Sequence, residues 1–275
     1  MTSYTRNIGD IRKAVLPVGE RPKQLSPLAS LLTFSWRAIL KIKHVPEQLI
    51  DVTASPIIFL LMFTYLFGGA IAGSTAIYLQ YLLPGILVMS VIFITIYTGV
   101  GLNNDIKKGV FDRFRSLPMW RPSVIVGALL ADIGRYTVAS LVVILLGVVL
   151  GFRPEGGVTG VFFSLLLLVV FSSSLSWLWI TLGLLMRTPE SLMAVSMMIL
   201  MPLTFASNVF VVPETMPWWL EAFVNINPVT YLVTAVRGLM SGTVDAGDIV
   251  WVLIASAVLF TVFSPLAMYV YRKKQ

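Results

Sequence analysis

The sequence predicts an all-α integral membrane protein with six transmembrane helices. Hydrophobic residues make up 57% of the 275 residues and Asp, Glu, Lys and Arg only 12%, whereas about a quarter of a soluble domain is charged. Mean hydropathy is +0.88. Long uncharged stretches can each hold helices of the ~20 residues that cross a bilayer, and the basic residues gather in alternate loops. Together these features exclude a soluble domain.

The amino-terminal segment, residues 1–27, is polar and basic. It has no apolar stretch of the kind that a secretory signal needs, so we expect it to stay uncleaved in the cytoplasm. The chain contains no cysteine, which excludes disulfides, thiolate chemistry and sulfur-ligated metal sites.

Residues 28–45 predict an amphipathic helix in the cytoplasmic interface. Ser26 and Pro27 fit an N-cap and a first helical position. Apolar side chains recur on one face, with Arg37 and Lys41 opposite, and Trp36 belongs to the same helix. The alternative is an early start of the first membrane helix.

Two spans fit the 53 consecutive uncharged residues between Asp51 and Asp105. The glycine-rich segment 68–75 predicts the turn between them. A six-span transmembrane domain is expected over residues 50–271, with a cytoplasmic tail at 272–275. The six spans are placed at about 52–67, 78–102, 122–152, 158–186, 191–212 and 249–271.

The basic residues predict the orientation. Seventeen of the 20 Lys and Arg residues lie in the amino segment, the second loop, the fourth loop and the tail. Only Arg153 and Arg237 fall on the opposite side, and Arg135 lies inside a span. The positive-inside rule therefore places both termini in the cytoplasm.

The second cytoplasmic loop predicts a short amphipathic helix over residues 104–118. It presents Phe111 and Phe114 together with several cations, and Pro118 ends it. Such a helix suits docking in a partner's groove. Five basic residues would equally suit a loop that lies on anionic lipid, and the residues alone leave these two interpretations open.

The external segment 213–242 is too long and too apolar for a simple connector. A short helix is expected at 216–223, after Thr215, and a second begins after the N-cap Asn227 and Pro228 and ends at Gly242. We expect a re-entrant hairpin packed against protein. Its candidate functional residues are Glu214, Trp218, Trp219, Glu221, Asn227, Pro228 and Arg237.

Asp132 and Arg135 are ionisable residues inside the third span. Three residues apart on a helix, they are close enough to pair. We favour a structural role, with a substrate or proton role as the alternative. Motifs for phosphate binding, zinc proteolysis and nucleophilic hydrolysis are absent, which argues against an enzyme acting alone.

Three stretches carry a resemblance to the permease subunit of type-two ABC exporters, and within them to the daunorubicin-resistance permeases. The first is the amphipathic helix before the first span. The others are the second loop with the third span, KKGVFDRFRSLPMWR and GALLADIGR, and the external segment NPVTYLVTAVRGLMSG.

The resemblance implies a coupling helix that docks on a separate ATPase subunit, where ATP and Mg would bind. It also implies a second permease copy or a sister permease, and neither a nucleic-acid partner nor a metal site in this chain. Relatives often carry an E-x-G-T pattern near the coupling helix, which this chain replaces by residues 106–110. The implied ATPase contacts are Gly109, Phe111, Asp112, Arg113, Phe114, Arg115, Ser116, Leu117 and Pro118.

The expected function is ATP-driven export of an amphiphilic drug-like or lipid-like substrate across the bacterial cytoplasmic membrane. One alternative is export of a lipid-linked polysaccharide. Another is a proton-driven secondary transporter that uses Asp132, and a third is a receptor or scaffold that binds a partner through its external tryptophans.

Overall fold

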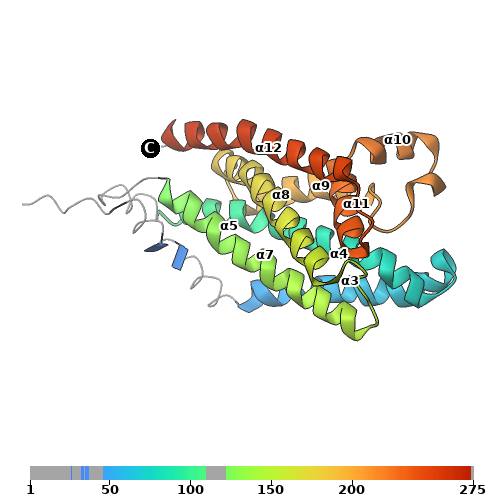
Figure 1. Cartoon of the computed structure of the whole chain (residues 1–275). Helices are drawn as coiled ribbons and strands as arrows, with labels where there is room; N and C mark the ends of the chain where they lie inside the picture. The colour runs from blue at the N-terminus through green and yellow to red at the C-terminus, as the bar shows by residue number, and fades with distance from the viewer. Residues whose placement is uncertain (1–25, 27–31, 34, 37–45, 110–121, 274–275) are drawn as a thin grey trace, which may run out of the picture.

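The computed structural model describes residues 26, 32–33, 35–36, 46–109 and 122–273, and all the regular structure within them is helical (Figure 1). An all-α fold is thus confirmed for these residues. The elements are α3 (Pro46–Ala72), α4 (Thr75–Ile94), α5 (Ile96–Lys107), α7 (Ser123–Val149), α8 (Gly157–Leu185), α9 (Pro189–Phe205), the 3₁₀ turn η1 (Pro213–Thr215), α10 (Trp218–Ile226), α11 (Pro228–Ser241) and α12 (Ala246–Lys273).

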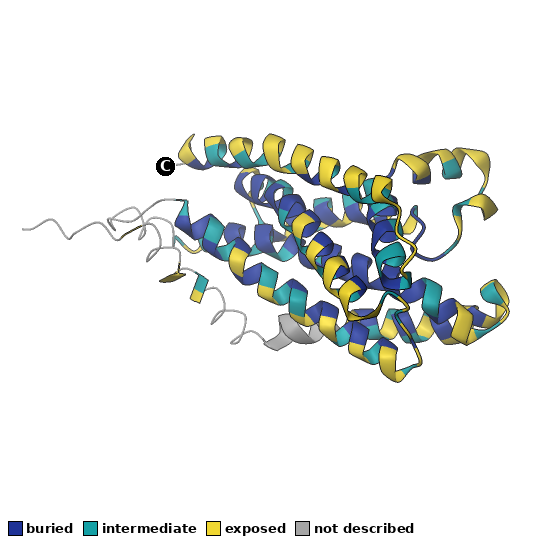
Figure 2. Cartoon of the chain, viewed as in Figure 1, coloured by how far each residue is buried: buried dark blue, intermediate teal, exposed yellow. Residues whose placement is uncertain are grey.

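The long helices lie side by side around α4, the most buried of them (Figure 2). The side chains of Leu82, Leu83 and Ile86 on α4 are fully buried. By contrast, α12 exposes a row of large apolar side chains along its outer face. An apolar centre together with apolar outer faces fits a helical bundle that is surrounded by lipid. The carboxyl end of α12 lies at one end of the bundle, and α10 lies at the other.

Within the described residues, five helical segments are long and apolar enough to span a membrane: α3, the α4–α5 segment, α7, α8 and α12. The predicted fifth span, 191–212, corresponds to α9, which has only 17 residues. Its continuation, residues 206–212, is not regular helix. A multi-pass membrane protein is therefore established, and the sixth crossing stays a prediction.

The turn between the first two spans lies within the predicted segment 68–75, but the helix before it is longer than predicted. Helix α3 runs through Gly68 to Ala72, and the chain reverses at Gly73, whose φ of +73° suits glycine. Gly68 has a packing role instead: a Cβ there would sit 3.0 Å from the Thr75 Cα. Close contact between α3 and α4 therefore explains the glycine that the sequence pattern assigned to the turn.

The second span also differs from its prediction, because it breaks at Thr95 and extends to Lys107. The predicted start of the coupling helix, residue 104, is therefore wrong, because residues 104–107 belong to α5. Gly109 follows with a φ of +66°, so the chain turns there. The other predicted coupling residues, 111–118, lie outside the described residues.

Glycines hold α5 against α8. A Cβ on Gly99 would come 2.3 Å from the Trp179 carbonyl oxygen, and one on Gly183 would come 2.7 Å from the Gly99 carbonyl oxygen. Just beyond this contact, the Asn103 side-chain amide donates to the carbonyl oxygens of Gly183 at 2.7 Å and Met186 at 2.9 Å. These contacts make α5 and α8 a tightly packed pair.

The predicted ends of the external hairpin are partly confirmed. Asn227 caps α11 by accepting a hydrogen bond from the Val229 N–H, and Gly242 ends it in the left-handed conformation. The first helix begins at Trp218 instead of Met216. Thr215 belongs to η1, and its hydroxyl donates to the Val212 carbonyl oxygen rather than capping α10.

Most of the predicted interfacial helix lies outside the described residues, including Arg37 and Lys41. Trp36 is described: it is helical, and 62% of its surface is exposed. The helical residues 32–33 and 35–36 agree with a helix in this region, while its position in the interface stays a prediction.

Candidate functional site

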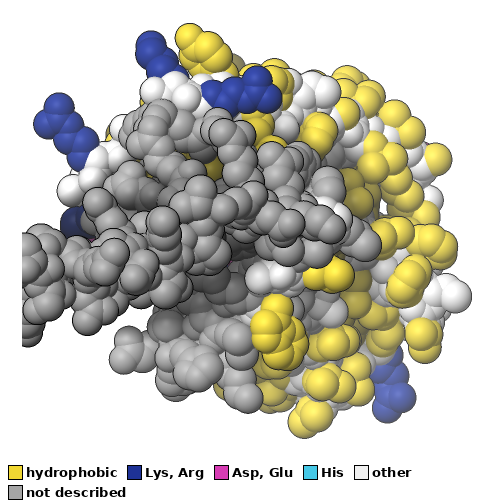
Figure 3. All heavy atoms as spheres, turned by 90° about the vertical axis from the view of Figure 1, so that its left-hand side faces the viewer, with side chains coloured by type: hydrophobic (Ala, Val, Ile, Leu, Met, Phe, Trp, Pro, Cys, Tyr) yellow, Lys and Arg dark blue, Asp and Glu magenta, His cyan; other side chains and the backbone are white. Residues whose placement is uncertain are grey.

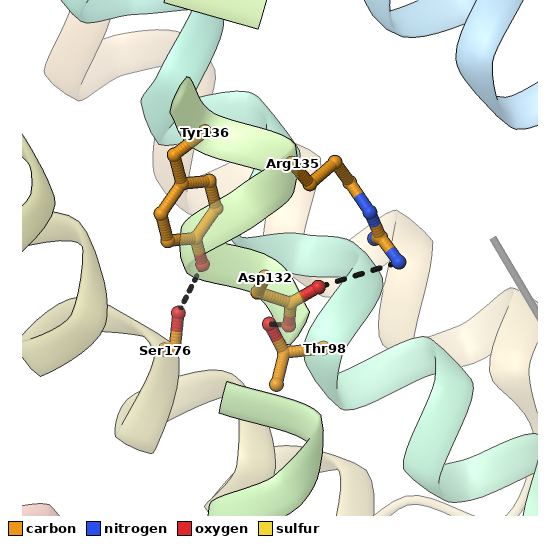
Figure 4. Close-up of polar contacts among 5 residues, drawn as sticks. All are labelled: Thr98, Asp132, Arg135, Tyr136 and Ser176. Carbon is orange, nitrogen blue, oxygen red and sulfur yellow. Dashed lines mark hydrogen bonds and ion pairs between the residues drawn. The ribbon is translucent and has the colours of Figure 1, made fainter. Parts of the chain in front are cut away.

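A polar cluster lies inside the bundle, where α7 meets α5 (Figure 4). The Arg135 Nη2 lies 3.3 Å from the Asp132 Oδ1, so the predicted pair is confirmed. The Thr98 hydroxyl on α5 donates to the other carboxylate oxygen of Asp132. Both oxygens of a buried carboxylate thus have partners, which lowers the cost of keeping its charge inside the bundle.

Two further hydrogen bonds join α8 to this cluster. The hydroxyls of Tyr136 and Ser176 are 2.7 Å apart, and the Trp179 indole N–H donates to the Thr95 hydroxyl at 2.7 Å. None of the residues Thr98, Tyr136, Ser176 and Trp179 was predicted to belong to a polar cluster. The sequence did contain a signal for these residues: they are polar groups within spans, and such groups need hydrogen-bond partners inside the protein.

Arg135 keeps hydrogen-bonding capacity beyond its ion pair. Its side chain is 10% exposed, and its Nε and Nη1 have no hydrogen-bond partner among the described residues. The guanidinium carbon lies 5.9 Å from the centroid of the Tyr97 ring. Because Tyr97 also lines the cavity described next, Arg135 lies just behind that cavity's wall.

An apolar cavity of about 250 Å³ lies between α3, the α4–α5 segment and α9. Aromatic and methionine side chains dominate its wall. Methionine adapts to irregular shapes, and its sulfur makes favourable contacts with aromatic rings. The cavity therefore suits an apolar ligand with ring systems. Its aromatic and methionine lining comprises Phe59, Phe93, Tyr97, Phe205, Met89, Met193, Met197 and Met201.

The end of the bundle that carries the C-terminus has Lys and Arg side chains at its rim, next to a hydrophobic flank (Figure 3). Lys107 and Lys108 close α5, and Arg272 and Lys273 form the last turn of α12. Basic residues on helices that end together fit the predicted cytoplasmic face.

At the opposite end, Arg237 on α11 binds two carbonyl groups. Its Nε donates to the Tyr81 carbonyl oxygen at 3.1 Å and its Nη2 to that of Asn208 at 3.0 Å. Its guanidinium carbon lies 3.8 Å from the Tyr81 ring centroid, a cation–π contact. Burial lowers the pKa of this guanidinium, and the neighbouring Tyr81 opposes that change.

The other hairpin candidates divide between anchoring and exposure. The Asn227 amide donates to the carbonyl oxygens of Leu203 and Ala206 at 2.7 and 2.8 Å, so it fastens the hairpin to the end of α9. Pro228 opens α11 as predicted. Trp218 and Trp219 are 81% and 60% exposed. Glu214 and Glu221, in η1 and α10, lie on the same outer segment.

Within the described residues, no cluster of three or more His, Cys, Asp or Glu side chains could hold a metal ion. The polar cluster around Asp132 can hold helices together and offer hydrogen bonds, and the cavity can hold an apolar molecule. This combination fits binding and movement of a ligand within the membrane.

Comparisons with known proteins point the same way. Residues 29–241 match the family described as ABC-2 type transporter. The chain is 51% identical to a daunorubicin resistance ABC transporter permease protein of Streptomyces coeruleorubidus, over 99% of this chain and 96% of that protein. It is 29% identical to a putative transport permease of Cyanophora paradoxa, covering 74% and 72% of the two chains. A doxorubicin resistance permease of Mycobacterium tuberculosis is 24% identical, over 76% and 75%.

Proposed function

Because the chain belongs to the ABC-2 type transporter family, we propose that it is the permease subunit of an ATP-driven exporter of amphiphilic, drug-like molecules. The observation that carries this proposal is the 51% identity, across almost the whole chain, to a permease named for daunorubicin resistance. The bacterial cytoplasmic membrane is the proposed location, with both termini on the cytoplasmic side and α9 as a sixth crossing.

The apolar cavity between α3, the α4–α5 segment and α9 supports this substrate class. Its aromatic and methionine wall offers ring contacts and adaptable packing but few hydrogen-bonding groups. Transfer of a large apolar ring system from water to such a wall would be favourable in free energy. Arg135, beside Tyr97, would offer an unsatisfied donor to a polar substituent.

The chain would depend on a separate ATPase subunit that binds ATP and Mg. The docking residues would be Gly109 and the set at 111–118, in the loop between α5 and α7. Hydrogen bonds tie both flanks of that loop into the bundle: Thr98 to Asp132, and Asn103 to the end of α8. Movement of the docked loop would therefore pull on the bundle's centre.

A second permease copy or a sister permease would complete the transporter. Helices α3 and α9 carry exposed apolar side chains beside the cavity, including Met198 at 79% and Met201 at 49%. A partner helix that covered this face would enclose the cavity between the two subunits. Alternating access would then follow from movement of one subunit against the other.

The test is daunorubicin uptake into inside-out membrane vesicles that contain this chain and its ATPase subunit. We expect uptake to require ATP and to be largely lost in the double variant Phe111→Ala/Phe114→Ala, with the ATPase activity retained but no longer stimulated by substrate. A matched control is Phe162→Ala/Phe163→Ala, because these two exposed phenylalanines lie near the start of α8, next to the turn that joins it to α7.

Normal ATP-driven uptake by the Phe111/Phe114 double variant would reject the coupling assignment. Uptake that proceeds without ATP and disappears in Asp132→Asn would favour the proton-driven alternative. Stimulation of the ATPase by a lipid-linked polysaccharide, with none by daunorubicin, would favour the polysaccharide exporter.

A further inference from the structure

A second cavity lies at the end of the bundle that the predicted topology places outside the cell. Its volume is about 430 Å³, within the ~300–1,000 Å³ typical of small-ligand pockets. The first turns of α4, the turn between α7 and α8, and the end of α11 form its walls. Unlike the apolar cavity, it is lined by charged and polar side chains, among them Gln80, Arg153, Glu155, Arg237 and Ser241.

The two arginines of this cavity stand out in the sequence. Arg153 and Arg237 are the only basic residues that the predicted orientation leaves on the external side. They are 84 positions apart, yet both line the same cavity. Because external loops are depleted of basic residues, the convergence of both external cations on one cavity indicates a local need for positive charge.

Arg237 is held in place without a counter-charge. Two carbonyl oxygens and the Tyr81 ring fix its guanidinium. Its Nη1 makes no hydrogen bond within the described chain, and no carboxylate there lies within ion-pair distance of it. A partly buried cation with a free donor favours an anion that supplies both the charge and the acceptor.

The walls of the cavity are formed before any ligand binds. The Gln80 side chain donates to the Gly151 carbonyl oxygen at 3.1 Å and accepts from the Arg153 backbone N–H at 3.2 Å. The Gly156 N–H donates to the Met240 carbonyl oxygen at 2.8 Å. These bonds fasten the α7–α8 turn to α4 and α11, so a ligand would lose little affinity to ordering of the site.

We propose that this external cavity binds the headgroup of a zwitterionic phospholipid of the phosphoethanolamine class. Arg153 and the free donor of Arg237 contact the phosphate, and Glu155 contacts the ammonium group. The inference rests on the orientation given under the proposed function, because only then does the cavity face the outer leaflet.

The position and the charges of the cavity favour this headgroup. The α7–α8 turn closes two membrane-spanning helices, so the cavity lies at the level where headgroups meet the hydrocarbon. Two arginines bind a phosphate well, while Glu155 reduces the net positive charge of the lining to one. A headgroup that carries both a phosphate and an amine matches that pattern, whereas phosphatidylglycerol lacks a partner for Glu155.

The test measures lipid binding to the purified full-length chain by native mass spectrometry, with phosphatidylethanolamine, phosphatidylglycerol and inorganic phosphate as probes. We expect Arg153→Gln to weaken phosphatidylethanolamine binding about tenfold, as loss of a charged hydrogen bond should. Glu155→Gln should remove the preference for phosphatidylethanolamine over phosphatidylglycerol. Both side chains are exposed, so neither change should unfold the chain.

Matched controls are Arg272→Gln, an exposed arginine at the other end of the bundle, and Asp245→Asn, an exposed external acid. Both should bind lipid like the unsubstituted chain. Equal affinity of Arg153→Gln and the unsubstituted chain would overturn the proposal. So would inorganic phosphate displacing the lipid at equal concentration, or daunorubicin displacing it, since the site would then serve a free anion or the substrate.

The lipid assay needs no ATP and no ATPase subunit, which separates it from the transport assay. A chain that binds phosphatidylethanolamine through Arg153 but exports no drug would sustain this inference and reject the proposed function. A chain that exports drug and binds no lipid would support the proposed function and reject this inference.

Discussion

Two partly buried arginines of this permease are accommodated in opposite ways. On α7, Arg135 has a counter-charge in Asp132, but two of its nitrogens have no hydrogen-bond partner in the described part of the chain. At the external end, Arg237 has two carbonyl acceptors and an aromatic ring but no carboxylate partner among the described residues.

The difference follows from the surroundings of each arginine. Deep in a bilayer an uncompensated charge is costly, so an ion pair is required there. Near the interface, solvent or a headgroup can supply the missing charge. The centre of the bundle thus contains a neutral pair, while its external end retains a net cation.

The largest expected effect comes from removing the counter-charge at the centre. Asp132→Asn keeps the shape of the side chain but leaves Arg135 buried and unpaired, so we expect a loss of about 3–5 kcal/mol in stability.

At the external end, Tyr81→Phe keeps the ring against Arg237 and removes only the hydroxyl that donates to the Asn208 carbonyl oxygen. That change should cost about 1 kcal/mol. Thermal unfolding in detergent measures both.

The double variant Asp132→Asn/Arg135→Gln serves as the control for this comparison. Removing both charges should recover much of the stability that Asp132→Asn loses, because no unpaired charge remains. If the single and double variants were equally unstable, the role of the ion pair would be rejected in favour of local packing.

A smaller effect is expected at the glycine contact between α5 and α8. Gly99→Ala would place a Cβ 2.3 Å from the Trp179 carbonyl oxygen, and relieving that overlap should cost about 1–3 kcal/mol. Gly101→Ala is the matched control on the same helix, since no atom lies within 4 Å of its added Cβ. Equal melting temperatures for the two variants would show that α5 and α8 can separate without penalty.

The third prediction concerns the topology: which end of the bundle lies on which side of the membrane. The chain has no cysteine, so single cysteines can be introduced at exposed positions and labelled with a membrane-impermeant reagent. We expect Glu155→Cys and Glu214→Cys to react in intact cells. Arg187→Cys and Arg272→Cys should react only after permeabilisation.

The cysteine pair around α9 decides the number of spans. Glu214→Cys reactive outside and Arg187→Cys protected would establish that α9 crosses the membrane despite its 17 residues. Reaction of both from the same side would limit the chain to five spans and would reverse the predicted placement of the C-terminus relative to the amino end.

The sequence by itself determined the helical class, the long spans and the pair at Asp132 and Arg135, because these depend on local composition and spacing. Capping residues also located the ends of α11, where the Asn227 side chain caps the first turn and Gly242 adopts the left-handed conformation. Local patterns could not separate a turn glycine from a packing glycine, which is why the predicted turn 68–75 included Gly68 as well as Gly73, where the chain reverses. That distinction depends on what the neighbouring helix presents.

Only the tertiary structure decided which distant polar groups meet. Thr98 reaches Asp132 across 34 positions, and Arg237 reaches the Tyr81 carbonyl across 156. Arg153 joins Arg237 at one cavity for the same reason: helix packing brings together side chains whose separation along the chain carries no periodic signal. The sequence could assign the two external arginines to one side of the membrane, but their convergence on one cavity arises from the fold.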